Sequence, residues 1–308
     1  MKNLSPMQKQ LTLIRREFWE QRIVFVLIPV CCVALAAVTF AFSTARGYFK
    51  DISPINVFVG GGLQIEGEPA RQALERFVQT PLIVKERLWE DFYMGPAVLE
   101  SLLFWSVMVY YYLSTLYNQR KDRSILFWNS MPVSDTQTVM SKLLSGLVLA
   151  QGVYLFCLLG VQLVMLAIFL VYGMIMDVDL WSTYIEPAHV ITRFIWILVA
   201  GVANIFWCLP VYAWFLFNSA WAKSAPVAWA AGPLIILIIP EMIIYNRSSI
   251  LEAFFEHVIP MQLLDKNAYT ADYASRMVQI FSQEMLISII LGVGLVVAAI
   301  RFNRSEDN

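Results

Sequence analysis

Six stretches of this sequence contain no Asp, Glu, Lys or Arg, and they constrain the fold more than any other feature. A charged side chain is costly inside a bilayer, and about 20 apolar residues are enough for a helix to cross it. Only 15% of the 308 residues are charged, too few to cover a soluble globule of this size. The chain is therefore predicted to be an all-α polytopic membrane protein. Lipid offers no hydrogen-bond partners, and a helix pairs its backbone polar groups within itself. The six stretches are residues 23–45, 101–119, 143–176, 194–222, 224–240 and 285–300.

Turn and charge signals around these stretches predict six transmembrane helices in a single transmembrane domain. The side that holds the N-terminus carries 12 basic and six acidic residues, which favours a cytoplasmic location. The short loop 173–189 has three acidic residues and no Lys or Arg, and is predicted to lie outside. Both termini are thus expected on the cytoplasmic side of the cytoplasmic (inner) membrane. Residues 44–93 and 247–282 are expected to form external loops. The predicted spans are 23–43, 94–117, 143–172, 190–218, 225–246 and 283–301.

The residues before the first span predict an amphipathic helix over 6–20. Ser5 followed by Pro6 is typical of an N-cap and a first helical turn. Basic residues occupy the other faces, so we expect the helix to lie on the cytoplasmic membrane surface against anionic headgroups. The alternative is a solvated helix with a chance apolar stripe. The stripe consists of Met7, Leu11, Ile14 and Phe18.

The cytoplasmic loop between the second and third spans combines basic and aromatic residues. It reads NQRKDRSILFWNSMPVSDTQTVMSK from Asn118 to Lys142, and a short helix is predicted over 119–131. Ser134 and Gln137 form a capping box that begins the next helix. Large apolar side chains on such a helix are typical of a helix that docks into a groove on another protein. They are equally typical of an interfacial helix whose aromatic residues lie among the lipid headgroups. The residues concerned are Arg123, Ile125, Leu126, Phe127 and Trp128.

Three ionisable residues fall within or at the edges of the predicted spans: Glu100, Arg193 and Glu241. Each is predicted to lie roughly 5–10 Å below the outer membrane boundary, at about 1.5 Å per residue. One interpretation is a polar cluster near the outer gate of a pathway, with Arg193 pairing with one or both carboxylates. The other is snorkelling of separate side chains to the interface. Pro240, directly before Glu241, would loosen the hydrogen bonds of the fifth span.

No residue pattern for catalysis is present. The chain has two histidines, His189 and His257, and no HExxH, paired-carboxylate or GxxxxGK[ST] motif, so we expect neither a metal nor a bound cofactor and no enzymatic activity of its own. The formal net charge of −1 makes nucleic acid an unfavourable partner. The four cysteines have no disulfide or zinc spacing and are predicted to be structural: Cys31, Cys32, Cys157 and Cys208.

Together these parts resemble the permease subunit of a type 2 ATP-binding-cassette exporter. The resemblance rests on the amphipathic N-terminal helix, six spans with both ends inside, and the loop continuing as MPVSDTQTVMSKLL. In this loop, Met131–Ser134 and the following Ser141–Leu144 are similar to the family's sequence after its coupling helix. A broken helical segment before the last span also agrees, whereas the first external loop is longer than in the family's simplest members.

The resemblance implies that two permease chains, as a homodimer or heterodimer, dock on two copies of a cytoplasmic ATPase that holds ATP and Mg²⁺. Residues around Arg123 to Trp128 would make this contact. It also implies a substrate path between the permease chains, lined by the second and fifth spans, which carry Glu100 and Glu241. The rival hypotheses are a non-transporting membrane sensor or immunity protein, and a secondary transporter, for which the chain lacks an internal repeat.

Overall fold

The computed structural model describes residues 5–50, 70–121, 134–258 and 283–305, and these residues contain helices and no strands. Six of the helical segments are long and apolar enough to cross a membrane. This confirms a polytopic helical membrane protein with six candidate spans. The segments are Ile23–Phe42, Leu82–Lys121, Asp135–Ile175, Trp181–Trp207, Pro226–Tyr245 and Gln283–Asn303.

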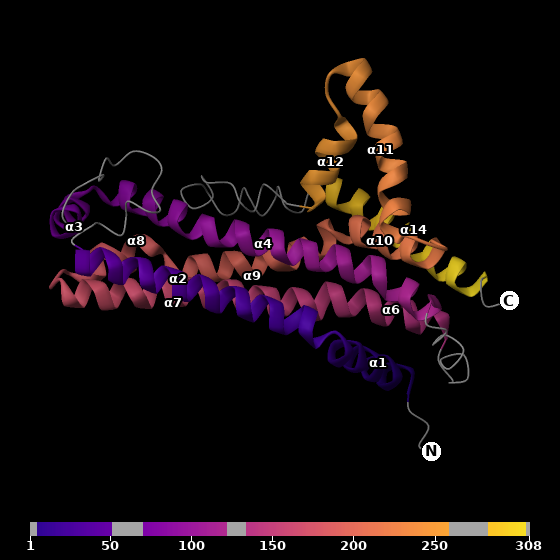
Figure 1. Ribbon diagram of the computed structural model, residues 1–308, viewed down its shortest axis with the longest axis horizontal. Helices are drawn as coiled ribbons and strands as arrows, with labels where there is room; N and C mark the ends of the chain where they lie inside the picture. Colours follow the sequence, from indigo (N-terminus) through magenta and orange to yellow (C-terminus); the bar gives the residue numbers. More distant parts are fainter. Residues whose placement is uncertain (1–4, 51–69, 122–133, 259–282, 306–308) are drawn as a thin grey trace.

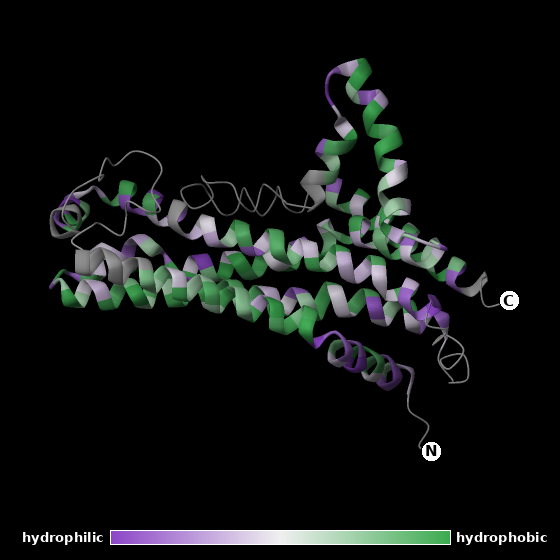
Figure 2. Ribbon diagram, viewed as in Figure 1, coloured by the Kyte–Doolittle hydropathy of each residue, from purple (hydrophilic) through white to green (hydrophobic). Residues whose placement is uncertain are grey.

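Four long helices run side by side as a bundle (Figure 1). They are α2 (Ile28–Lys50), α4 (Leu82–Lys121), α7 (Gln151–Ile175) and α9 (Val190–Trp207). A π-helical segment precedes α2 and another precedes α7, namely η1 (Ile23–Leu27) and η3 (Ser145–Ala150). Apolar residues cover most of the length of these helices (Figure 2).

The two ends of the bundle differ in what they contain (Figure 1). The α1 end holds the end of α4 and three further elements: α1 (Pro6–Glu20), α6 (Asp135–Leu144) and the end of α14 (Gln283–Ser305). The α3 end holds the start of α4 with α3 (Ala70–Gln79), η4 (Trp181–Ile185) and α8 (Glu186–Ala188). The first described helix and the end of the last one thus lie at the same end of the bundle, on either side of α6 (Figure 1).

Side-chain caps fix the starts of α1 and α6 as the sequence predicts. Ser5 accepts a hydrogen bond from the Gln8 backbone at 3.3 Å, and the Gln8 side chain accepts one from the Ser5 backbone at 3.0 Å. Ser134 and Gln137 make the same reciprocal pair at 3.3 and 3.2 Å. Both boxes satisfy backbone N–H groups that have no partner within the helix.

The second span belongs to a 40-residue helix that extends well beyond the predicted 94–117. Thr80 and Pro81 separate it from α3, so the predicted external loop 44–93 contains two helices from Ala70 onward. The extension is held by an aromatic cluster in which the Trp89 ring lies 4.9 Å from that of Phe169 and 5.9 Å from that of Tyr184. Helix α4 therefore begins well inside the segment 44–93, which is predicted to be an external loop.

The fourth predicted span, 190–218, is not one continuous helix. Helix α9 ends at Trp207, and α10 (Leu209–Trp221) begins after Cys208. Pro210 lies in the first turn of α10, where its missing N–H is tolerated, whereas inside a continuous helix it would clash with the preceding turn. The break allows α10 to pack along α4 and α14.

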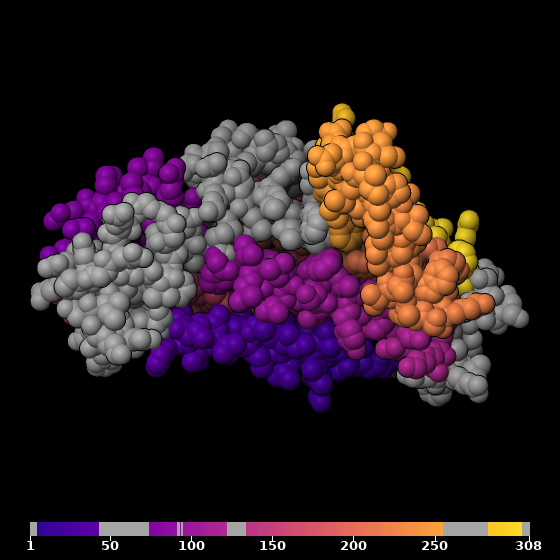
Figure 3. All heavy atoms as spheres, turned by 45° about the horizontal axis from the view of Figure 1, so that its top comes forward, coloured from indigo at the N-terminus to yellow at the C-terminus, as the bar shows by residue number. Residues whose placement is uncertain are grey.

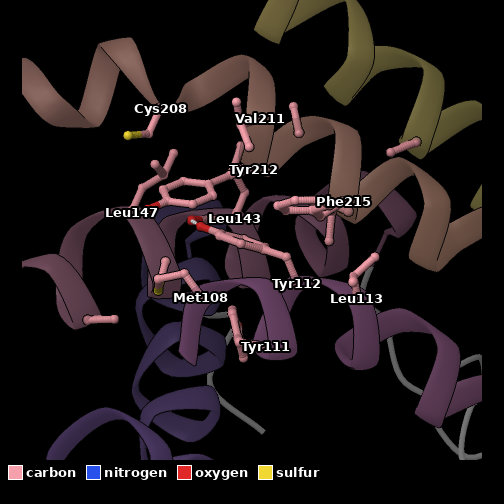
Figure 4. Close-up of a cluster of buried hydrophobic side chains, with 14 of the residues drawn as sticks. Met108, Tyr111, Tyr112, Leu113, Leu143, Leu147, Cys208, Val211, Tyr212 and Phe215 are labelled. Atoms are coloured by element: carbon pink, nitrogen blue, oxygen red, sulfur yellow. Dashed lines mark hydrogen bonds between the residues drawn. The ribbon is translucent and has the colours of Figure 1, made fainter. Parts of the chain in front are cut away.

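The main core lies where α4, the α6–η3 segment and α10 meet (Figure 4). The rings of Tyr112 and Tyr212 stack with their centroids 5.0 Å apart. The buried Tyr112 hydroxyl donates to the Leu143 carbonyl at 2.9 Å, so this polar group is satisfied inside the core. Met108 and Leu216 complete the packing with no solvent exposure.

Helices α11 (Pro226–Tyr245) and α12 (Ser249–Val258) form a hairpin that stands away from the bundle (Figures 1 and 3). Only Ala230 of α11 is buried, while Ile236 and Ile243 are more than 70% exposed. The aromatic contact between Phe254 and Trp105 joins the hairpin to α4. An apolar helix of span length is thus left almost uncovered by the rest of the described structure.

We predict that Gly146→Ala destabilises the bundle, because the added methyl group would meet the Tyr112 ring and lie 2.9 Å from the end of Met108. Both side chains are fully buried and have no room to move, so the loss should be about 1–3 kcal/mol. Gly152→Ala is the matched control, since nothing lies within 4 Å of its new methyl group. Thermal unfolding in detergent compares the two, and equal melting temperatures would contradict this packing.

Candidate functional site

The predicted coupling helix, 119–131, falls largely outside the described residues. Its first three positions belong to the end of α4, and the structure resumes at the Ser134 cap of α6. The predicted docking residues Arg123 and Ile125 to Trp128 thus lie in the part that is not described. The structure does describe the helices that flank this loop, α4 and α6, and the residues that contact them.

A buried ion pair joins α1 to the base of the loop. The Lys142 ammonium group lies 3.1 and 3.2 Å from the two carboxylate oxygens of Glu17, and both side chains are less than 6% exposed. Lys142 also donates to the Thr115 hydroxyl at 2.7 Å, and Thr115 donates to Glu17 at 3.1 Å. The Tyr111 hydroxyl lies within hydrogen-bonding distance of Glu17 at 3.2 Å. Helices α1, α4 and α6 are therefore tied together by one fully buried polar cluster, the Glu17 cluster.

The electrostatics of the Glu17 cluster favour the ionised carboxylate. Burial alone would raise the pKa of Glu17, but the Lys142 charge and the hydrogen bonds from Lys142, Thr115 and Tyr111 together hold this pKa below its usual value. A carboxylate with a lowered pKa stabilises the fold above its unfolded pKa and loses this effect as the pH falls through the folded value. The Glu17 cluster is thus fully formed at neutral pH.

Helix α1 presents a second, apolar face besides the one that carries Glu17. Met7 is 74% exposed and Leu11 is 55% exposed. At about 100° per residue, Met7 lies about 80° and Leu11 about 120° from Glu17 around the helix. A helix on a membrane surface buries its apolar face at the boundary between headgroups and acyl chains, and here the face that carries Glu17 points in a different direction. The interfacial position of α1 remains a prediction, and this geometry is compatible with it.

A second set of contacts fixes the other side of the loop base. Arg120, in the last turn of α4, donates to the carbonyl oxygen of Ser219 and, at 3.0 Å, to that of Ala222. The Ser219 hydroxyl accepts from the backbone N–H groups of Leu116 and Tyr117 at 3.1 and 3.0 Å. A basic residue at a helix C-terminus satisfies final carbonyl groups, so α4 and α10 end as one unit.

The three ionisable residues predicted to form a gate are not brought together. Among the described residues, neither Glu100 nor Glu241 lies within ion-pair distance of Arg193. The Arg193 guanidinium instead lies 4.5 Å from the centroid of the Tyr93 ring, beside a small cavity that Gln162 also lines. Glu100 is buried on α4, two turns further along the helix than Tyr93.

Glu241 has a local structural role at the turn between α11 and α12. Its carboxylate accepts from the Ser248 hydroxyl at 3.1 Å and from the backbone N–H groups of Ser249 and Ile250 at 3.1 and 3.3 Å. Acidic groups stabilise helix N-termini because they satisfy unpaired N–H donors and the helix dipole. Glu241 therefore holds the hairpin together.

Sequence reasoning missed the Glu17 cluster and the Arg120 contacts. Lys142 had a visible signal, since it is a single charge at the start of an apolar run of 34 residues. Its partner Glu17 lies 125 positions away, and one sequence contains no information on that pairing. Both residues had been counted only as cytoplasmic charges.

Comparisons with known proteins add no functional assignment. No family model, no curated protein and no solved structure matches this chain. Within the described residues, no group of three or more His, Cys, Asp or Glu side chains is placed to hold a metal ion. The site must be interpreted from its own geometry.

We predict that Lys142→Met lowers the stability of the bundle by about 3–5 kcal/mol, because it leaves the buried Glu17 carboxylate without its counter-charge. The double variant Glu17→Leu/Lys142→Met should lose less than this single variant, since no buried charge remains. Melting temperatures in detergent, arranged as a double-mutant cycle, measure the coupling.

The matched control is the exposed ion pair between Arg16 and Glu20 on the same helix. Arg16→Ala should cost no more than about 1 kcal/mol, because exposed pairs contribute little. Additive effects of Glu17→Leu and Lys142→Met would show that the buried pair is not formed.

Proposed function

We propose that this chain is the permease subunit of an ATP-driven exporter and moves a substrate outward across the cytoplasmic membrane. The observation that carries the proposal is the mounting of the loop 122–133. Its two ends leave helices that buried polar contacts join to α1 on one side and to α10 on the other. A loop mounted in this way can pass a force from a cytoplasmic partner into four helices at once.

The partner in this proposal is a pair of ATPase subunits that hold ATP and Mg²⁺, while the chain itself performs no chemistry. The docking contact would be made by Arg123, Ile125, Leu126, Phe127 and Trp128, as the family resemblance implies. Closure of the ATPase pair would push the loop and tilt α4 and the α6–α7 segment as rigid bodies. The Glu17 cluster would carry α1 along with them.

A second permease chain, identical or related, would complete the pathway. Helix α11 supports this part of the proposal, because it has the length of a span and almost no cover from the described part of its own chain. The resemblance assigns the corresponding span to the interface between the two permease chains. Exposed residues such as Ile236, Ile243 and Ile244 would then face the second copy and the bilayer.

The proposal places the α1 end in the cytoplasm, with α1 at the membrane surface and both termini inside. Two observations support this orientation. The helix ends that flank the basic loop, Lys121 of α4 and Asp135 of α6, lie at the same end as α1 and the end of α14 (Figure 1). Lys and Arg also dominate these segments, as is usual on the cytoplasmic side.

We predict that Phe127→Asp and Trp128→Asp each abolish co-purification of the ATPase subunit. A charged side chain in a desolvated docking groove would lack a partner, and anchors of this kind contribute most of the binding energy. The measurement is affinity purification of the tagged chain from native membranes, followed by an ATP-hydrolysis assay. Membrane insertion should be unchanged, because the substitutions lie outside all six spans.

Trp19→Asp provides a matched control, since Trp19 is 57% exposed on α1 and also lies outside the six candidate spans. This variant should retain the ATPase. Normal co-purification with both Phe127→Asp and Trp128→Asp would overturn the docking site.

A further inference from the structure

Glu100 is a buried carboxyl group that the proposed function does not use. It lies near the middle of α4 and is 7% exposed. Two thiols are its titratable neighbours on the helices packed against this part of α4: Cys32 on α2 and Cys157 on α7. Tyr154, also on α7, is the third titratable neighbour. None of these groups carries a positive charge, so no cation among the described neighbours offsets a carboxylate here.

Both oxygen atoms of Glu100 lack a hydrogen-bond partner within the described structure. The adjacent hydroxyl groups cannot supply one. Ser101 donates its proton to the Ala97 carbonyl at 2.7 Å, so its 2.6 Å contact with Tyr154 must use the Tyr154 proton. Each hydroxyl has a single proton to give, and both are committed elsewhere.

An ionised carboxylate in this environment would be far more costly than a neutral carboxyl group. An isolated buried charge costs much more than a buried neutral polar group, and such a side chain becomes neutral instead. Glu241 shows the contrast, because its carboxylate accepts four hydrogen bonds at the start of α12. With no cation and no donor nearby, the form of Glu100 that fits this packing is the protonated one.

We propose that Glu100 is a proton-binding site inside the membrane domain. The proton is bound while α2, α4 and α7 are packed together, and it is released when these helices separate and water reaches the carboxyl group. Proton binding and helix packing are then thermodynamically linked, so that each shifts the other. This inference goes beyond the proposed function and does not require an ATPase partner.

Infrared spectroscopy of the full chain in lipid membranes tests the proposal directly, because a protonated carboxyl group has a carbonyl absorption that a carboxylate lacks. At neutral pH, the difference spectrum between the wild-type protein and Glu100→Gln should show the loss of one protonated carboxyl group per chain. Glu241→Gln is the matched control, and the spectrum of that variant should retain the absorption.

Two results would overturn the proposal: the absence of a protonated-carboxyl absorption from the wild-type protein at neutral pH, or its persistence in Glu100→Gln. Gln is a neutral side chain of nearly the same shape, so this variant should fold normally. If its yield is too low for spectroscopy, Glu100→Asp provides the second test. The carboxyl absorption should then shift in frequency, and a spectrum identical to that of the wild-type protein would contradict the assignment.

Discussion

The cost of an unpaired charge away from water governs how this chain is organised. Charges are absent from most of each span, and the Glu17–Lys142 pair, Glu241 and Glu100 avoid this cost in three different ways. Lys142 and Glu17 neutralise each other at the α1 end. Glu241 is satisfied by a helix N-terminus, and Glu100 has no partner in the described structure, which is the basis for assigning it a proton. The buried Glu17–Lys142 pair joins helices, Glu241 stabilises the α11–α12 hairpin, and Glu100 is the proposed titratable site.

Much of the fold follows from the sequence because it depends on local physics. Apolar stretches of span length predicted the six membrane-crossing candidates, and the caps at Ser5 and Ser134 depend on residues three positions apart. Two features were missed for identifiable reasons. The second span was predicted to begin at residue 94, although a helix can continue past a membrane when other elements cover it. Pro210 was visible, but the uninterrupted apolar run around it predicted a continuous span.

The candidate site was less accessible to sequence analysis because its contacts are long-range. The sequence drew attention to the loop through its basic and aromatic residues, but the Glu17 cluster joins residues from three distant segments. Glu241 was assigned to a gate by its predicted depth, which it shared with Glu100 and Arg193. Depth alone does not determine distance within the membrane plane, and the serines that bind Glu241 follow it by only seven and eight positions.

Buried polar contacts tie the helices of this chain together at the base of the loop 122–133, to which the proposed function assigns the contact with an ATPase. The proposed function is most directly tested by the composition of the complex in native membranes. Purification of the full chain in mild detergent should recover an ATP-hydrolysing subunit in a 1:1 ratio with it. Recovery of the chain in a folded, homogeneous form without any ATPase would contradict the exporter assignment.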